Sequence, residues 1–185
     1  PLYEDDLSFG GRERVFSPVH HYLLALFGLF LPELWLVKVL PNLFAAAIVF
    51  PAYGIGKHLT RRKGLGLVTA GMTGLAPATF LVGVNDASPI TISLTLLVTV
   101  AYFFMRSRHT GAHLDWLLVT IVAIIVLQPI SVVFLLGLAL YIVLIQLLHV
   151  RTTGKDIEVL LFTLFFSLWF TMVVYKKAFV AHGVS

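Results

Sequence analysis

The sequence predicts an all-α protein, a polytopic transmembrane bundle of about six crossings with one further helix in the membrane interface. Hydrophobic residues make up 59% of the 185 residues and charged residues only 12%, and the mean hydropathy is +0.97. A water-soluble domain of this length has no core large enough to bury so much apolar surface. Apolar runs close to the ~20 residues that span the hydrocarbon layer alternate with short polar stretches. The residue-by-residue alternation of a β-barrel is missing, so helices are the expected spanning elements.

The predicted crossings are six apolar runs, and polar or proline-containing stretches separate them. The runs cover residues 35–54, 65–84, 89–104, 114–127, 130–148 and 159–175. In the second of them, Gly66, Ala70 and Gly74 recur at a spacing of four residues. Small residues at this spacing form one helix face that lets a neighbouring backbone approach closely. We therefore expect that face to pack against another helix.

A shorter apolar helix is predicted before the first crossing. Ser17 is a favourable N-cap, Pro18 suits the first helical position, and Pro32 follows the last apolar residue. A helix over 18–31 is only about 21 Å long, which is short for a crossing, so we place it in the interface. The predicted organisation is an external acidic loop at 1–17, the interfacial helix at 18–31 and a transmembrane bundle at 35–177.

Basic residues predict the orientation of this bundle, because Lys and Arg near helix ends favour the cytoplasmic side. If 18–31 does not cross, eight of the 13 basic residues lie inside: Lys57, Arg61, Arg62, Lys63, Arg106, Arg108, Arg151 and Lys155. Six of the nine acidic residues then lie outside: Glu4, Asp5, Asp6, Glu13, Glu33 and Asp86. This topology also places both chain ends outside.

The most polar stretch of the chain is its amino-terminal end. Carboxylates can bind a divalent cation or accept a proton from an attacking nucleophile, so Asp5 and Asp6 are candidate catalytic residues and candidate ligands of Mg²⁺ or Mn²⁺. Arginine grips phosphate through paired hydrogen bonds, which makes Arg12 and Arg14, with Glu4, candidate substrate-binding residues. A solvated acidic terminus with ordinary interfacial arginines explains these residue types equally well.

Two further polar groups are predicted to line the same site. Asn85 and Asp86 form a polar turn that the topology places on the same side as the acidic loop. His20 and His21 begin the interfacial helix, where adjacent side chains point about 100° apart. They cannot serve one metal together as an i, i+4 pair does, so at most one of them faces the site. A first-turn histidine is more often an interfacial polar residue than a ligand.

Several function classes are disfavoured by what the sequence lacks. The chain has no cysteine, which excludes disulfides and thiolate metal sites. Its basic residues are divided among helix ends instead of forming one patch, so no nucleic-acid partner is expected. No ionisable residue lies near the midpoint of an apolar run, whereas pumps and carriers use such residues.

Several segments carry a family resemblance. Residues 6–12 (DLSFGGR) and 16–25 (FSPVHHYLLA) resemble the first external loop and following helix of GT-C-fold, polyprenyl-phosphate-dependent glycosyltransferases, especially prokaryotic and archaeal members. Looser matches are the segments KVLP at 38–41, GKHLTRR at 56–62, LAP at 75–77 and NDASP at 85–89. The resemblance covers most of the chain. It implies a module related to oligosaccharyltransferase catalytic subunits and protein O-mannosyltransferases.

The resemblance also implies an activity, a lipid partner and a location. It predicts sugar transfer from a polyprenyl-phosphate lipid at the outer face of a prokaryotic or archaeal cell membrane, with Asp5 or Asp6 as base or cation ligand and Arg12 or Arg14 on the donor phosphate. Members of the family have a first helix ending in a catalytic acid, so the chain is expected to be a fragment. The alternative hypothesis is a non-catalytic membrane scaffold that binds partner subunits through small-residue helix faces.

Overall fold

The part of the chain that the structure describes is helical, as predicted, apart from short turns and one pair of two-residue strands. The computed structural model describes residues 4–5, 12–13, 19–76, 89–110, 113–128, 132–147 and 154–181. The strands are β1 (Glu4–Asp5) and β2 (Arg12–Glu13). The helical elements are α1 (Val19–Gly28), the π-helical turn η1 (Trp35–Val39), α2 (Leu40–Ala46), α3 (Val49–Thr60), α4 (Lys63–Gly74), α6 (Pro89–Thr110), α7 (Leu114–Leu127), α8 (Val132–Leu147) and α9 (Gly154–Ala181).

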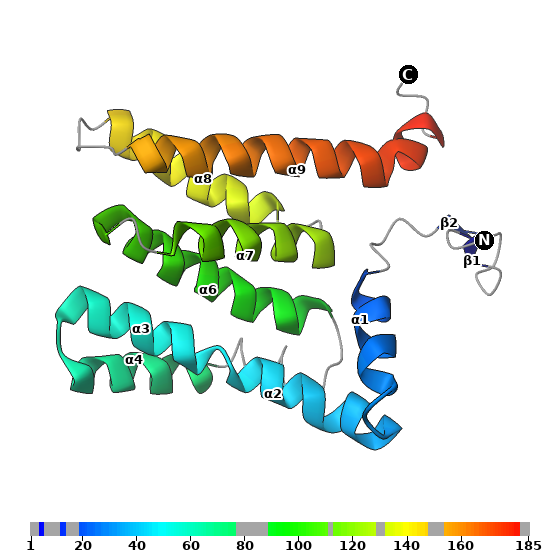
Figure 1. Cartoon of the computed structure of the whole chain (residues 1–185), viewed down its shortest axis with the longest axis horizontal. Coiled ribbons are helices and arrows are strands. Elements are labelled where there is room, and N and C mark those ends of the chain that lie inside the picture. The colour runs from blue at the N-terminus through cyan, green and yellow to red at the C-terminus, as the bar shows by residue number, and fades with distance from the viewer. Residues whose placement is uncertain are drawn as a thin grey trace.

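The helices from α3 to α9 lie side by side, and successive helices run in opposite directions (Figure 1). Helix α3 packs against α4 and α6, α7 packs against α6 and α9, and α8 packs against α9. Helix α1 runs crosswise at one end of this bundle, beside the start of α6 and the end of α7 (Figure 1). The turn between α3 and α4, the end of α6 and the start of α9 lie at the other end (Figure 1).

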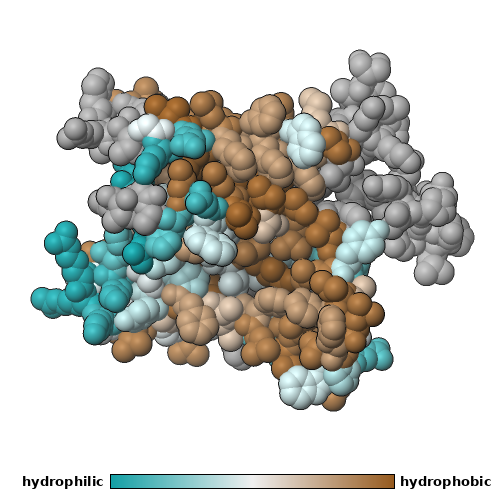
Figure 2. Space-filling model, viewed as in Figure 1, coloured by the Kyte–Doolittle hydropathy of each residue, from teal (hydrophilic) through white to brown (hydrophobic). Residues whose placement is uncertain are grey.

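We call this second end the basic end, because seven described Lys and Arg residues belong to it: Lys57, Arg61, Arg62, Lys63, Arg106, Arg108 and Lys155. Hydrophilic side chains gather there, and a broad hydrophobic surface covers the middle of the molecule (Figure 2). We call the end that holds α1 the opposite end. The structure thus separates the basic helix ends from the polar amino-terminal side along the bundle axis.

Within the described residues, which leave out 77–88, three of the six expected crossings have the length and composition of a membrane span: Trp35–Thr60, Pro89–Arg108 and Gly154–Val173. The remaining helices are shorter. Helix α7 has 14 residues and α8 has 16, which correspond to about 21 and 24 Å. Helix α4, with 12 residues, is shorter than both α7 and α8. The structure therefore supports a helical membrane protein with three candidate spans, and the predicted number of six is not confirmed.

The apolar side chains of these spans lie mainly on the outer surface. Only 22% to 33% of each candidate window is buried within the chain. Phe50 of the first span and Phe165 and Leu168 of the third are 65% to 77% exposed. A contiguous apolar surface of this extent is unfavourable in water, but hydrocarbon tails solvate it without that cost. The chain is consequently built to be surrounded by lipid.

The interior core lies among the last four helices. It contains Val100 and Phe104 of α6, residues of α7, and Leu135, Ile142 and Val159 from α8 and α9. On the other side of α6, α3 and α4 pack through glycine. A Cβ at Gly56 would collide with the Thr69 side chain, and one at Gly66 would meet the Tyr53 ring at 3.0 Å. The predicted small-residue packing face on α4 is confirmed, and α3 of the same chain covers it.

The first candidate span is interrupted at Ala47–Ile48, where α2 ends and α3 begins. Pro51 has no N–H to give to Ala47, and the Ala47 carbonyl accepts a hydrogen bond from the N–H of Phe50 at 3.2 Å instead. The N–H of Ile48 turns to Ala45, at 3.3 Å. The Thr95 hydroxyl of α6 donates to the Phe44 carbonyl at 2.8 Å. A side chain thus replaces the missing helical donor and joins α2 to α6.

An ion pair joins α6 to α9 at the basic end. The Nε of Arg108 lies 3.2 Å from Oδ1 of Asp156, and the two side chains are 22% and 3% exposed. Asp156 is in the first turn of α9, where the helix dipole favours a negative charge. The pair therefore fixes the start of α9 against the end of α6.

Candidate functional site

The structure describes only part of the predicted amino-terminal site. Glu4 and Asp5 lie in β1, which pairs with β2 so that Asp5 is opposite Arg12 and Glu4 is opposite Glu13. The predicted loop at 1–17 thus contains a short antiparallel ladder. The remaining predicted residues of the two polar segments, Asp6, Arg14, Asn85 and Asp86, lie outside the described residues.

The adjacent histidines of α1 occupy different environments, as the helical geometry predicts. His20 is buried, with 4% of its surface exposed, whereas His21 is exposed. Their ring centroids are 5.7 Å apart in an edge-to-face arrangement. Helix α1 packs against α7, so His20 is the histidine held by the bundle.

Other polar side chains are buried at the same end of the bundle. Thr91 and Ser93, in the first turns of α6, are 2% and 7% exposed. The Ser93 hydroxyl donates to Oε1 of Gln128 at 3.4 Å, and Gln128 is the residue that ends α7. Buried polar groups need hydrogen-bonding partners, and the contact between Ser93 and Gln128 joins the start of α6 to the end of α7. The topology predicted from the sequence places Gln128 on the same side as the acidic loop, Asn85 and Asp86.

The structure also contains a cavity that sequence analysis did not predict. It lies between α3 and α6 near the basic end and has a volume of about 1080 Å³. We call it the α3–α6 groove. Its α3 side includes Phe50, Gly54 and Lys57, and its α6 side includes Thr99 and Arg106. Residues on each side recur every three or four positions, so they share one helix face.

The middle of the groove is shaped by a close contact between the two helices. The Tyr102 ring lies directly against Gly54, where a Cβ would collide with it. Below this contact the Thr99 hydroxyl donates to the Thr95 carbonyl at 2.8 Å. The hydroxyl is therefore satisfied within its own helix, and the wall presents mainly apolar surface there.

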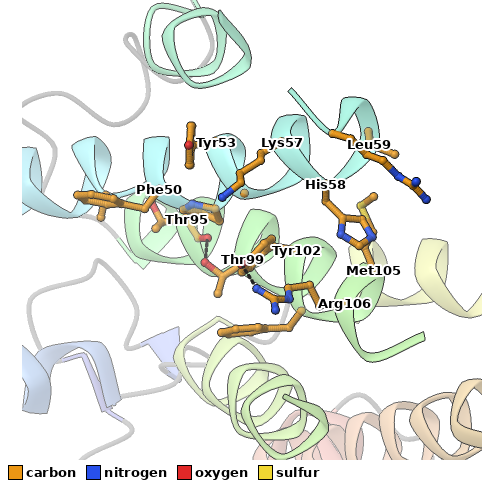
Figure 3. A pocket seen from close by; sticks show the side chains of 15 residues that line it. Phe50, Tyr53, Lys57, His58, Leu59, Thr95, Thr99, Tyr102, Met105 and Arg106 are labelled. Atoms are coloured by element: carbon orange, nitrogen blue, oxygen red, sulfur yellow. Dashed lines mark hydrogen bonds between the residues drawn. The ribbon is translucent and has the colours of Figure 1, made fainter. Parts of the chain in front are cut away.

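The end of the groove nearest the basic end is positively charged. Lys57, His58 and Arg61 reach it from α3, and Arg106 reaches it from α6. Figure 3 shows Lys57 extending from α3 toward α6 and Arg106 turning back toward Tyr102. The Arg106 Nη1 donates to the Tyr102 hydroxyl at 3.1 Å. Among the described residues that line the groove, none is acidic.

This arrangement is suited to binding a negatively charged group. Tyr102 orients the guanidinium of Arg106, and the Lys57 ammonium lies 6.0 Å from the centre of the Tyr53 ring. Cations beside an apolar channel match a negatively charged group with a hydrophobic tail. Within the described part of the chain, no group of three or more His, Cys, Asp or Glu residues could hold a metal ion.

The signal for the groove was present in the sequence. Lys57 and Arg61 are four residues apart, as are Tyr102 and Arg106, but within each helix these cations indicate only orientation. Their facing positions depend on α3 packing against α6, which no local pattern specifies.

Comparison with protein-family models, with curated proteins and with solved structures finds no match to this chain.

Proposed function

We propose that this chain is the membrane module of a glycosyltransferase that uses a polyprenyl-phosphate sugar lipid. The proposal rests on the resemblance of residues 6–25 to external loop segments of GT-C glycosyltransferases. Its main structural support is the layout of helix ends. The start of α1, the start of α6 and the end of α7 lie together, away from the basic end (Figure 1).

This layout supports a common site for the two polar segments of the sequence. The acidic stretch leads directly into α1, and the Asn85-Asp86 segment leads directly into α6. Both helices therefore begin at the opposite end, where His20, Thr91 and Ser93 are buried. In the proposed site Asp5 or Asp6 acts as base or as ligand of Mg²⁺ or Mn²⁺, and Arg12 or Arg14 holds the donor phosphate.

The proposed topology has six crossings, with α1 in the interface and both chain ends external. The three candidate spans supply α2–α3, α6 and α9, and the shorter α4, α7 and α8 complete the antiparallel order seen in Figure 1. The crosswise direction of α1 agrees with an interfacial position. The membrane is that of a prokaryotic cell, in line with the resemblance.

The proposal is tested by sugar transfer from a polyprenyl-phosphate lipid with the full-length protein that contains this chain. Replacing Asp5 and Asp6 together by Asn should abolish transfer, because the candidate base and cation ligands are lost. His20→Gln should lower transfer, whereas His21→Gln, its exposed neighbour, should leave it unchanged. Unchanged transfer by the double Asp variant would remove these residues from the mechanism.

A matched control uses two acids at the basic end. Asp115 and Glu158 are both exposed, and the double change Asp115→Asn with Glu158→Gln removes the same charge. Equal loss of transfer in this control and in the Asp5 and Asp6 variant would point to a general charge effect and contradict the assignment.

The scaffold hypothesis remains the alternative. One small-residue face on which it relied is occupied, because Gly66 packs against Tyr53 of α3 and Gly74 lies beside Val49. Purification in mild detergent separates the two hypotheses. Retention of a polyprenyl-phosphate lipid supports the enzyme, and a stoichiometric protein partner without such a lipid supports the scaffold.

A further inference from the structure

We infer that the α3–α6 groove binds one anionic phospholipid from the membrane leaflet at the basic end. Its phosphate would lie among Lys57, Arg61 and Arg106, and its chains would follow the apolar part of the groove. This inference does not depend on sugar transfer, since the groove and the proposed catalytic site belong to opposite ends of the bundle.

The charges of the groove favour a phosphate group. Lysine and arginine bind phosphate oxygens through charge-assisted hydrogen bonds, and basic pockets between membrane helices are known sites for anionic headgroups. The Tyr102 hydroxyl accepts a hydrogen bond from Arg106 at 3.1 Å and so limits the positions of the guanidinium. No acidic side chain among the described lining residues opposes an anion.

The apolar part of the groove favours a lipid over a free anion. Ala47, Phe50 and Pro51 line the end away from the charges. Phe50 is 77% exposed on the surface that faces hydrocarbon, so a chain that follows this wall leaves the groove directly into the bilayer. The volume of about 1080 Å³ is at the upper limit of ordinary ligand pockets, and it accommodates a headgroup with the first part of its chains.

The same basic residues indicate that the lipid comes from the cytoplasmic leaflet. An excess of Lys and Arg marks the cytoplasmic side, where anionic lipids produce a negative surface potential. The basic end is therefore exposed to the class of lipid that the groove fits.

The experiment is native mass spectrometry of the purified full chain in detergent, titrated with phosphatidylglycerol or with zwitterionic phosphatidylcholine. One phosphatidylglycerol should remain bound at concentrations where phosphatidylcholine is lost. The double change Lys57→Gln with Arg106→Gln should weaken phosphatidylglycerol binding about 10- to 30-fold, from about a fivefold loss per cation. Lys57→Arg, which keeps the charge, should retain it.

The matched control is Arg62→Gln with Lys63→Gln. Both residues are exposed at the same end, but neither lines the groove, so binding should change by less than about twofold. Equal weakening by the two double variants, or equal retention of the two lipids, would overturn the inference. A melting temperature close to that of the unchanged chain shows that each variant is folded.

Two competition arms identify the source of the phosphate. Inorganic phosphate at millimolar concentration should not displace phosphatidylglycerol; displacement would mean that the groove recognises the anion alone. Polyprenyl phosphate should also compete poorly; strong competition would assign the groove to the sugar-donor class and refute a phospholipid. The Asp5 and Asp6 double variant should retain phosphatidylglycerol whether or not it transfers sugar, so the two proposals fail separately.

Discussion

The ion pair between Arg108 and Asp156 allows a quantitative prediction for the packing of α9. At the observed N–O distance of 3.2 Å, two unit charges attract by about 5 kcal/mol at an effective dielectric constant near 20. Loss of hydration by the buried Asp156 side chain offsets part of this energy. Because Arg108 is 22% exposed, water screens the pair further. We expect Asp156→Asn to lower the free energy of unfolding by about 2–4 kcal/mol.

The assay is thermal unfolding in detergent, followed by the fluorescence of the three tryptophans. The expected loss corresponds to a fall in melting temperature of about 5–15 °C for a chain of this size. Asp115→Asn is the control. Asp115 also lies in a first helical turn but is exposed, so only a dipole contribution of up to about 1 kcal/mol is lost.

Two outcomes would contradict a stabilising ion pair. An equal fall in melting temperature for Asp156→Asn and Asp115→Asn would mean that the pair adds nothing beyond the helix dipole. Additive effects of Arg108→Gln and Asp156→Asn in the double variant would mean that the two side chains are not energetically coupled.

Two other predictions concern helix packing and topology. Gly54→Ala should destabilise the chain by about 1–2 kcal/mol, since its Cβ would collide with the Tyr102 ring. The control Gly71→Ala has nothing within 4 Å of its Cβ and should stabilise the chain by about 0.5–1 kcal/mol. Melting temperatures measure both effects, and a gain in both variants would contradict the contact between Gly54 and Tyr102. The chain has no cysteine, so Glu33→Cys and Arg62→Cys can be labelled singly in sealed right-side-out vesicles. A membrane-impermeant maleimide should label the first and not the second, and labelling of both would contradict the proposed orientation.

The sequence predicted the helical class and the positions of most helices, because apolar runs specify where a chain can meet lipid. The predicted run 114–127 coincides with α7, and the run 130–148 contains all of α8, its other residues lying outside the described part of the chain. Helix lengths were less predictable. Helix α9 begins at Gly154, five residues before the predicted 159, since amphipathic first turns carry charged residues that an apolar count leaves out.

Local backbone features explain other differences. The turn between α3 and α4 is short because Arg61 adopts a left-handed conformation, with φ of 56°. A glycine is the usual residue at such a position, so an arginine there does not indicate a turn. The break at Ala47–Ile48 follows from Pro51, but the compensating contact with Thr95 comes from a residue 51 positions from Phe44. Long-range partners of this kind cannot be read from one segment.

The same limit applies to the candidate sites. Helical geometry predicted that His20 and His21 diverge, and the fold decides that His20 is the buried one. The α3–α6 groove forms only because one face of α3 and one face of α6 lie opposite each other. The residues on one face alone indicate only which end of that helix is basic.

The hydrogen bond from Thr95 to the Phe44 carbonyl has a consequence for how the bundle responds to force. Inside hydrocarbon no water is present to take over a carbonyl that loses its donor. Sliding α6 along α2 would therefore leave the Phe44 carbonyl without a hydrogen-bond donor. The break at Ala47–Ile48 in this way sets the axial position of α6 relative to α2. The Thr95 hydroxyl thus adds a directional constraint to the packing of α2 against α6.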